Sequence, residues 1–168
     1  TWESLRLQIP AGLNAQLSGI VWWTTDTGGF SGGVAESPGF QELLVRWVEY
    51  STFCPVLRMH GTRTFHDKQG FAHCPNEPWS FGESVLRHLT TMLWLRERMR
   101  PYIMEQMKIA STHGVPVQRP LWFDYKEDDP TVTELEPYTF LFGDDLLVAP
   151  IVHSNRTSRD VYLPRNTN

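Results

Sequence analysis

The sequence predicts an α/β fold, in which the last strand-helix units of a (β/α)8 TIM barrel are followed by the start of an antiparallel β-sandwich. Helical periodicity and short apolar runs alternate over residues 1–61, which is the pattern of helices that cover a parallel sheet. After residue 114 the chain consists of short strand-like runs separated by proline, glycine and aspartate. We therefore expect the C-terminal part of a barrel at residues 1–114 and the start of a sandwich at residues 115–168. A complete barrel needs roughly 200 residues or more, so the predicted barrel is incomplete.

The predicted barrel part begins with a helix. Apolar residues at spacings of three and four predict this helix up to about Leu17, with a kink at Pro10, which lacks a backbone donor. An apolar run at residues 20–23 then fits a strand that is buried on both faces. A second helix is predicted over residues 38–51 and a second strand over residues 56–59. This order is that of consecutive strand-helix units.

The rest of the chain is predicted to contain two more helices and several strands. Ser80 and Glu83 have the spacing of a capping box at a helix start. Pro101 is expected to open a further helix, because a proline at the first helical position forfeits no hydrogen bond, and Gly114 is expected to end it. The strand-like runs are residues 115–125, 138–142, 146–152 and 160–163.

Charge and hydropathy exclude several classes of partner. The net charge is -4 and no basic run occurs, which argues against a nucleic-acid partner. The longest strongly apolar stretch, residues 146–152, is far shorter than the ~20 residues that cross a bilayer, so no membrane span is predicted.

Seven tryptophans and nine phenylalanines exceed what a core of this size needs, and stacking on sugar rings is one use for the surplus.

Neither a metal site nor a cofactor is indicated by the sequence. Cys54 and Cys74 lack C-x-x-C spacing and clustered histidine partners, which favours a structural or free thiol at each position. No targeting signal can be read before Thr1, so the compartment stays unknown, with secretion the preferred hypothesis.

Polar side chains follow the two predicted barrel strands. Asp26 comes shortly after residues 20–23, and His60 comes directly after residues 56–59. The carboxyl ends of parallel barrel strands form the face that holds the active site, so both side chains are expected at the same rim. Arg58 is expected to pair with a carboxylate beneath this site.

Several consecutive motifs resemble those of glycoside hydrolase family 31. The motifs, in chain order, are WWTTDTGGF at residues 22–30, ELLVRW at 42–47, FCPVLRMHG at 53–61, PWSFG at 78–82, GVPVQRPL at 114–121 and LFGDDLLVAP at 141–150. The resemblance covers nearly the whole chain, and so many motifs in the same order do not arise by chance.

The resemblance implies a retaining, exo-acting α-glycosidase that hydrolyses terminal α-linked xylose or glucose. Such an enzyme uses two aspartates about 5 Å apart, one as nucleophile and one as general acid/base. Both are expected upstream of Thr1, so no catalytic residue is assigned within this chain, and the isolated chain is expected to be inactive. Asp26 and His60 match family residues that contact the sugar. Phe30 matches an apolar wall of the same subsite, although a core ring under the glycine-rich loop is an equal alternative.

Other interpretations stay open at this point. Asn76-Glu77-Pro78 looks like the acid/base motif of other sugar-cleaving barrels, but its position past the last predicted strand favours an ordinary loop residue for Glu77. The chain could also belong to a non-catalytic carbohydrate-binding relative of the same fold, because Asp26 and His60 can bind a sugar without cleaving it. The runs at residues 22–26 and 76–80 resemble α-xylosidases more than α-glucosidases. The implied partner is a small carbohydrate.

Overall fold

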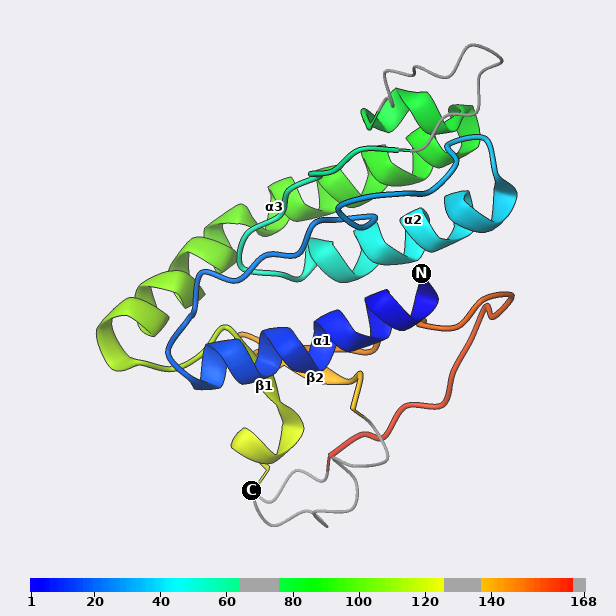
Figure 1. Cartoon of the computed structure of the whole chain (residues 1–168). Coiled ribbons are helices and arrows are strands. Elements are labelled where there is room, and N and C mark those ends of the chain that lie inside the picture. Colours follow the sequence, from blue (N-terminus) through cyan, green and yellow to red (C-terminus); the bar gives the residue numbers. More distant parts are fainter. Residues whose placement is uncertain (64–75, 126–136, 165–168) are drawn as a thin grey trace.

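The computed structural model describes residues 1–63, 76–125 and 137–164. Figure 1 shows α2 and α3 side by side, while α1 lies over the strands of a small sheet. No helix within these residues is long and apolar enough to cross a membrane. The elements are α1 (Trp2–Leu17), α2 (Pro38–Thr52), the 3-10 helix η1 (Pro78–Phe81), α3 (Glu83–His113), β1 (Gln118–Pro120), the 3-10 helix η2 (Leu121–Phe123), β2 (Phe140–Phe142) and β3 (Leu146–Val148).

Helix α1 has the predicted extent. It begins after Thr1, whose side-chain oxygen accepts a hydrogen bond from the backbone amide of Ser4 at 3.1 Å, which satisfies one of the free amides of the first turn. The helix continues through Pro10, and the chain leaves it through Gly19 in the left-handed region, at φ 89°. Its buried face consists of Leu5, Ile9, Gly12, Leu13 and Gln16.

The two strands predicted in the barrel part are not regular strands. Residues 20–23 and 56–59 form irregular segments joined by the bond from Val56 N to Trp23 O at 3.1 Å, and just beyond the first run Thr27 N donates to Arg58 O at 3.3 Å. An isolated parallel bridge joins Ser31 and Thr62. These contacts advance in the same direction along both segments, so the predicted parallel orientation holds. The bonds are too few and too widely spaced to make the continuous ladder that defines a strand.

Helix α3 is a single helix of 31 residues, so the prediction that Pro101 opens a second helix is wrong. Proline removes one hydrogen bond and strains the turn before it, but strong helix formers flank it. Burial of Ile103, Met107 and Ala110 stabilises the second half of the helix. The predicted end at Gly114 is confirmed, with φ 72°.

The capping box predicted at Ser80 and Glu83 is also wrong. Gly82 occupies the N-cap position of α3 and has no side chain that could accept a hydrogen bond from the first turn. Ser80 lies one element earlier, in η1, and its hydroxyl donates to Glu77 Oε2 at 3.2 Å.

The C-terminal part contains a three-stranded antiparallel sheet in the order β1-β2-β3. Gln118 pairs with Phe142, and Phe142 in turn pairs with Leu146. This confirms the predicted change from helices to an antiparallel sheet, but the strands are shorter than expected. Residues 121–123 form η2, and residues 160–163 form no strand.

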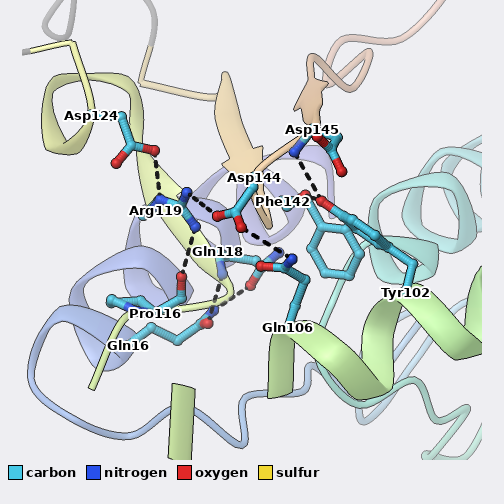
Figure 2. A network of polar contacts seen from close by, with 10 residues as sticks. All are labelled: Gln16, Tyr102, Gln106, Pro116, Gln118, Arg119, Asp124, Phe142, Asp144 and Asp145. Atoms are coloured by element: carbon cyan, nitrogen blue, oxygen red, sulfur yellow. Dashed lines mark hydrogen bonds and ion pairs between the residues drawn. The ribbon is translucent and has the colours of Figure 1, made fainter. Parts of the chain in front are cut away.

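A buried pair of amide side chains joins α1 to the sheet (Figure 2). Gln16 Nε2 donates to Gln118 Oε1 at 2.6 Å, and the backbone amide of Gln118 donates to Gln16 Oε1 at 2.9 Å. Both residues are 1% exposed, so both oxygens and the Gln16 Nε2 rely on this pairing, while Gln118 Nε2 donates to the Phe53 carbonyl oxygen at 2.8 Å. Next to it, Arg119 forms ion pairs with Asp124 at 2.7 Å and with Asp144 at 3.0 Å.

One hydrophobic cluster contains side chains from all three α-helices and from the sheet. The sheet therefore packs on the same core as the helices of the barrel part. The buried members of this core are Leu5, Ile9, Leu13, Leu43, Trp47, Tyr50, Cys54, Ile103, Met107, Ala110, Val117, Phe140, Phe142, Val148 and Val152.

Cys54 is a free thiol inside this core, whereas Cys74 lies outside the described residues. Burial raises the pKa of the Cys54 thiol to about 12, and its neighbours Tyr50, Arg96 and Gln118 offset only part of this effect. The thiol pKa is thus higher in the folded chain than the ~8.5 of an unfolded thiol. The contribution of this group to stability is complete below about pH 8.5 and is lost as the pH rises toward 12.

We expect Cys54 in the intact folded protein to resist iodoacetamide at mildly alkaline pH, because the thiolate is the reacting form. Full labelling is expected after unfolding. Peptide mass spectrometry of labelled samples, before and after denaturation, checks this at Cys54 alone. Equal labelling in both states would contradict the burial.

Candidate functional site

Asp26 lies where the first extended segment turns into a glycine-rich loop. Its Oδ1 accepts a hydrogen bond from Arg58 Nη2 at 3.1 Å, so Arg58 pairs with a carboxylate as expected, but with that of Asp26 itself rather than with one beneath the site. The Asp26 side chain is 32% exposed and that of Arg58 is 50% exposed, so the pair lies at the surface. The pair fixes one carboxylate oxygen, and an ionised carboxylate can accept further hydrogen bonds.

Phe30 and His60 contact each other across the two segments. Their ring centroids are 5.5 Å apart and the planes are inclined by 31°. Phe30 is 61% exposed, so its ring is not part of a core. The structure thus links Asp26 to the second segment through Arg58, and His60 to the first segment through Phe30.

A cavity of about 620 Å³ opens beside these residues. It is lined by the start of α1, by residues of the glycine-rich loop and by one face of α2, and its lining includes Asp26 and Phe30. A second cavity, of about 560 Å³, lies among residues 138–160 and contains none of the predicted site residues. The first cavity is the candidate site, because Asp26 and Phe30 line it; His60 is not among its lining residues and is connected to it through its ring contact with Phe30.

Gly61 allows the two segments to approach each other. Its φ is 146°, a conformation that favours glycine. A Cβ atom at this position would lie 2.6 Å from the carbonyl oxygens of both Gly29 and Phe30. Directly beyond it, Thr62 N donates to Phe30 O at 2.9 Å. The absence of a side chain at Gly61 thus sets the separation between His60 and the loop that carries Phe30.

Arg63 is a component of this region that sequence reasoning missed. Its side chain is inserted among the backbone carbonyls of the glycine-rich loop, and the residue is only 1% exposed. Burial lowers the pKa of its guanidinium from the ordinary value, although arginine stays charged at neutral pH. No sequence pattern distinguishes such a buried arginine from the surface arginines that most chains contain.

Glu77 has a structural contact and lies outside the cavity lining. Its carboxylate accepts from the Ser80 hydroxyl at the start of η1, in agreement with its interpretation as a loop residue. Within residues 1–63, 76–125 and 137–164, no three histidine, cysteine or acidic side chains are grouped so that they could hold a metal ion.

The fold and this site define the end of a barrel domain followed by a C-terminal β-domain. Residues 1–106 match the TIM-barrel domain of glycosyl hydrolases family 31, and residues 114–168 match the glycosyl hydrolase family 31 C-terminal domain. The chain belongs to glycosyl hydrolase family 31.

Three relatives are similar over nearly the whole chain. The α-xylosidase of Saccharolobus solfataricus is 39% identical over 97% of this chain and 21% of its own length. α-Xylosidase A of Aspergillus niger is 35% identical over 98% of this chain and 24% of its own. The crystal structure of a family 31 α-xylosidase from a soil metagenome, complexed with xylose, is 45% identical, with a TM-score of 0.87, over 99% of this chain and 26% of that chain. The chain thus spans about a quarter or less of the curated relatives that it matches.

Proposed function

We propose that this chain forms the end of the catalytic barrel of a retaining α-glycosidase, and that the intact enzyme releases terminal α-linked xylose. The observation that carries the proposal is that Asp26 and Phe30 line one cavity, while His60, on the parallel segment, contacts the Phe30 ring. Membership of family 31 supports the reaction class, and the α-xylosidase relatives support the choice of sugar.

The exposed groups of the site suit a sugar ring. The Asp26 carboxylate accepts hydrogen bonds from sugar hydroxyls while Arg58 fixes its orientation. His60 offers a ring nitrogen, and the exposed face of Phe30 covers apolar C–H groups of the sugar. Hydrogen bonds to hydroxyls tighten as the ring flattens toward an oxocarbenium ion, so these contacts act mainly in the transition state. We propose no residue of this chain as nucleophile or acid/base.

Release of p-nitrophenol from the α-xyloside and from the α-glucoside by the intact enzyme tests this function. We expect a clear preference for the xyloside, and no release by the chain expressed alone. A glucoside preference would overturn the choice of xylose. Binding of xylose without cleavage of either substrate would instead favour the non-catalytic carbohydrate-binding relative.

A further inference from the structure

The Arg63 guanidinium contacts the glycine-rich loop from the opposite segment through several hydrogen bonds. Its Nη1 donates to the carbonyl oxygens of Gly28 at 3.2 Å, Gly29 at 2.9 Å and Gly32 at 3.2 Å. Its Nε donates to Asn76 Oδ1 at 2.8 Å. One side chain thus holds both ends of the turn that carries Phe30 and connects this turn to the segment that precedes η1.

Arg63 holds the loop through backbone carbonyl groups, and we call its bonds to the carbonyls of residues 28, 29 and 32 the clamp. No carboxylate in the described part of the chain forms an ion pair with it, so its charge is balanced by carbonyl dipoles. The guanidinium carbon lies 5.0 Å from the centroid of the Phe40 ring, a cation–π contact. The same ring also lies against Gly33, where a Cβ atom would lie 2.3 Å from Phe40 Cε2. Arg63 and Gly33 therefore both pack on the Phe40 ring, which supports the guanidinium and the loop together.

Hydrogen bonds of this number and geometry require a planar donor. The guanidinium offers five N–H groups in a fixed fork, whereas a lysine ammonium is a compact charge with three donors. Glycine-rich backbone has many accessible conformations, and Gly28, Gly29, Gly32 and Gly33 all have positive φ. The Thr62 N to Phe30 O bond and the Ser31–Thr62 bridge join one side of this loop to the His60 segment, and Arg63 adds the bonds that hold the glycine carbonyls on either side of Phe30.

We propose that Arg63 is a positioning residue, which shapes the sugar subsite by holding the loop of residues 28–33 so that Phe30 faces His60 beside Asp26. This inference rests on the proposed function. Arg63 itself lies behind the loop and is not among the residues that line the cavity. Its effect on the reaction is transmitted through the position of Phe30 and of the loop backbone.

The test uses Arg63→Lys and Arg63→Ala in the intact enzyme, with steady-state kinetics on the preferred α-glycoside. A misplaced apolar wall weakens binding of the sugar, so KM is expected to rise about tenfold or more in both variants, with a smaller change in kcat. Low-millimolar guanidinium is expected to restore KM in Arg63→Ala by occupying the vacated space, but not in Arg63→Lys. An unchanged KM in both variants would overturn the proposal.

Arg119→Lys is the matched control. Arg119 is another buried arginine, 4% exposed, and its ion pairs lie in the sheet region rather than beside the cavity. We expect this variant to lower the melting temperature and to leave KM unchanged. A similar rise in KM in both lysine variants would show that Arg63 acts only through general stability.

The positioning role and the proposed function can fail separately. If the unmodified enzyme cleaves neither the xyloside nor the glucoside, the proposed function is wrong. Amide hydrogen exchange of residues 28–33 then tests the clamp, and exchange is expected to be faster in Arg63→Lys than in the unmodified enzyme. Equal exchange rates would remove the basis for the inference.

Discussion

Asp26→Asn in the intact enzyme is expected to lower kcat/KM for the preferred α-glycoside about a hundredfold. Asparagine keeps the shape of the side chain but loses the charge that pairs with Arg58 and that strengthens hydrogen bonds to sugar hydroxyls. The loss is expected chiefly in kcat, because these hydrogen bonds tighten in the transition state. Initial-rate measurements with p-nitrophenyl substrates provide both constants.

Glu83→Gln is the control for Asp26→Asn. Glu83 also forms an ion pair with an arginine, Arg87, at 3.0 Å, but both side chains are highly exposed on the first turns of α3. An exposed pair contributes little to stability, and this one lies outside the cavity lining, so unchanged kinetics are expected. Full activity in Asp26→Asn would show that its carboxylate does not contact the substrate.

Gly61→Ala is expected to abolish most of the activity and to lower the melting temperature of the intact enzyme. The new Cβ atom would lie 2.6 Å from two backbone carbonyl oxygens, neither of which can rotate away, so the His60 segment must move from the loop. Strain of this kind costs about 1–3 kcal/mol, and misplacement of a substrate-binding group by about 1 Å can cost a hundredfold in rate.

Gly19→Ala separates steric clash from backbone strain. Gly19 also has a positive φ, at 89°, but a Cβ atom there would meet no other atom within 4 Å. This variant is expected to be slightly less stable and fully active. Equal activity losses in the two variants, measured as kcat/KM, would contradict a specific role for the close approach at Gly61.

The helices could be predicted from the sequence because each has an apolar face at helical spacing. α1 and α2 end close to where periodicity placed them, since the flanking glycine and prolines act locally. The continuity of α3 through Pro101 could not be predicted in this way. It depends on tertiary packing of residues distant in the sequence, including the contact between α3 and the sheet.

The candidate site could be predicted only in part. Asp26 and His60 could be proposed because polar residues that follow apolar runs are visible in the sequence, and the family resemblance pointed to the same positions. Arg63 and Gly61 could not, because their importance lies in what surrounds them: carbonyl groups contributed by the other segment. A similar limit applies to the two extended segments, whose apolar runs predicted strands although few backbone bonds join them.

The Gln16–Gln118 pair has a consequence for engineering of this family member. Exchange of the β-domain with that of another relative would bring a new partner to the Gln16 amide, and a partner without matching donors and acceptors would leave it desolvated and unbonded. A functional chimera should therefore carry over both glutamines together, because Gln118 also donates to the Phe53 carbonyl oxygen. The two glutamines thus form a matched pair at the junction between the two parts of the chain.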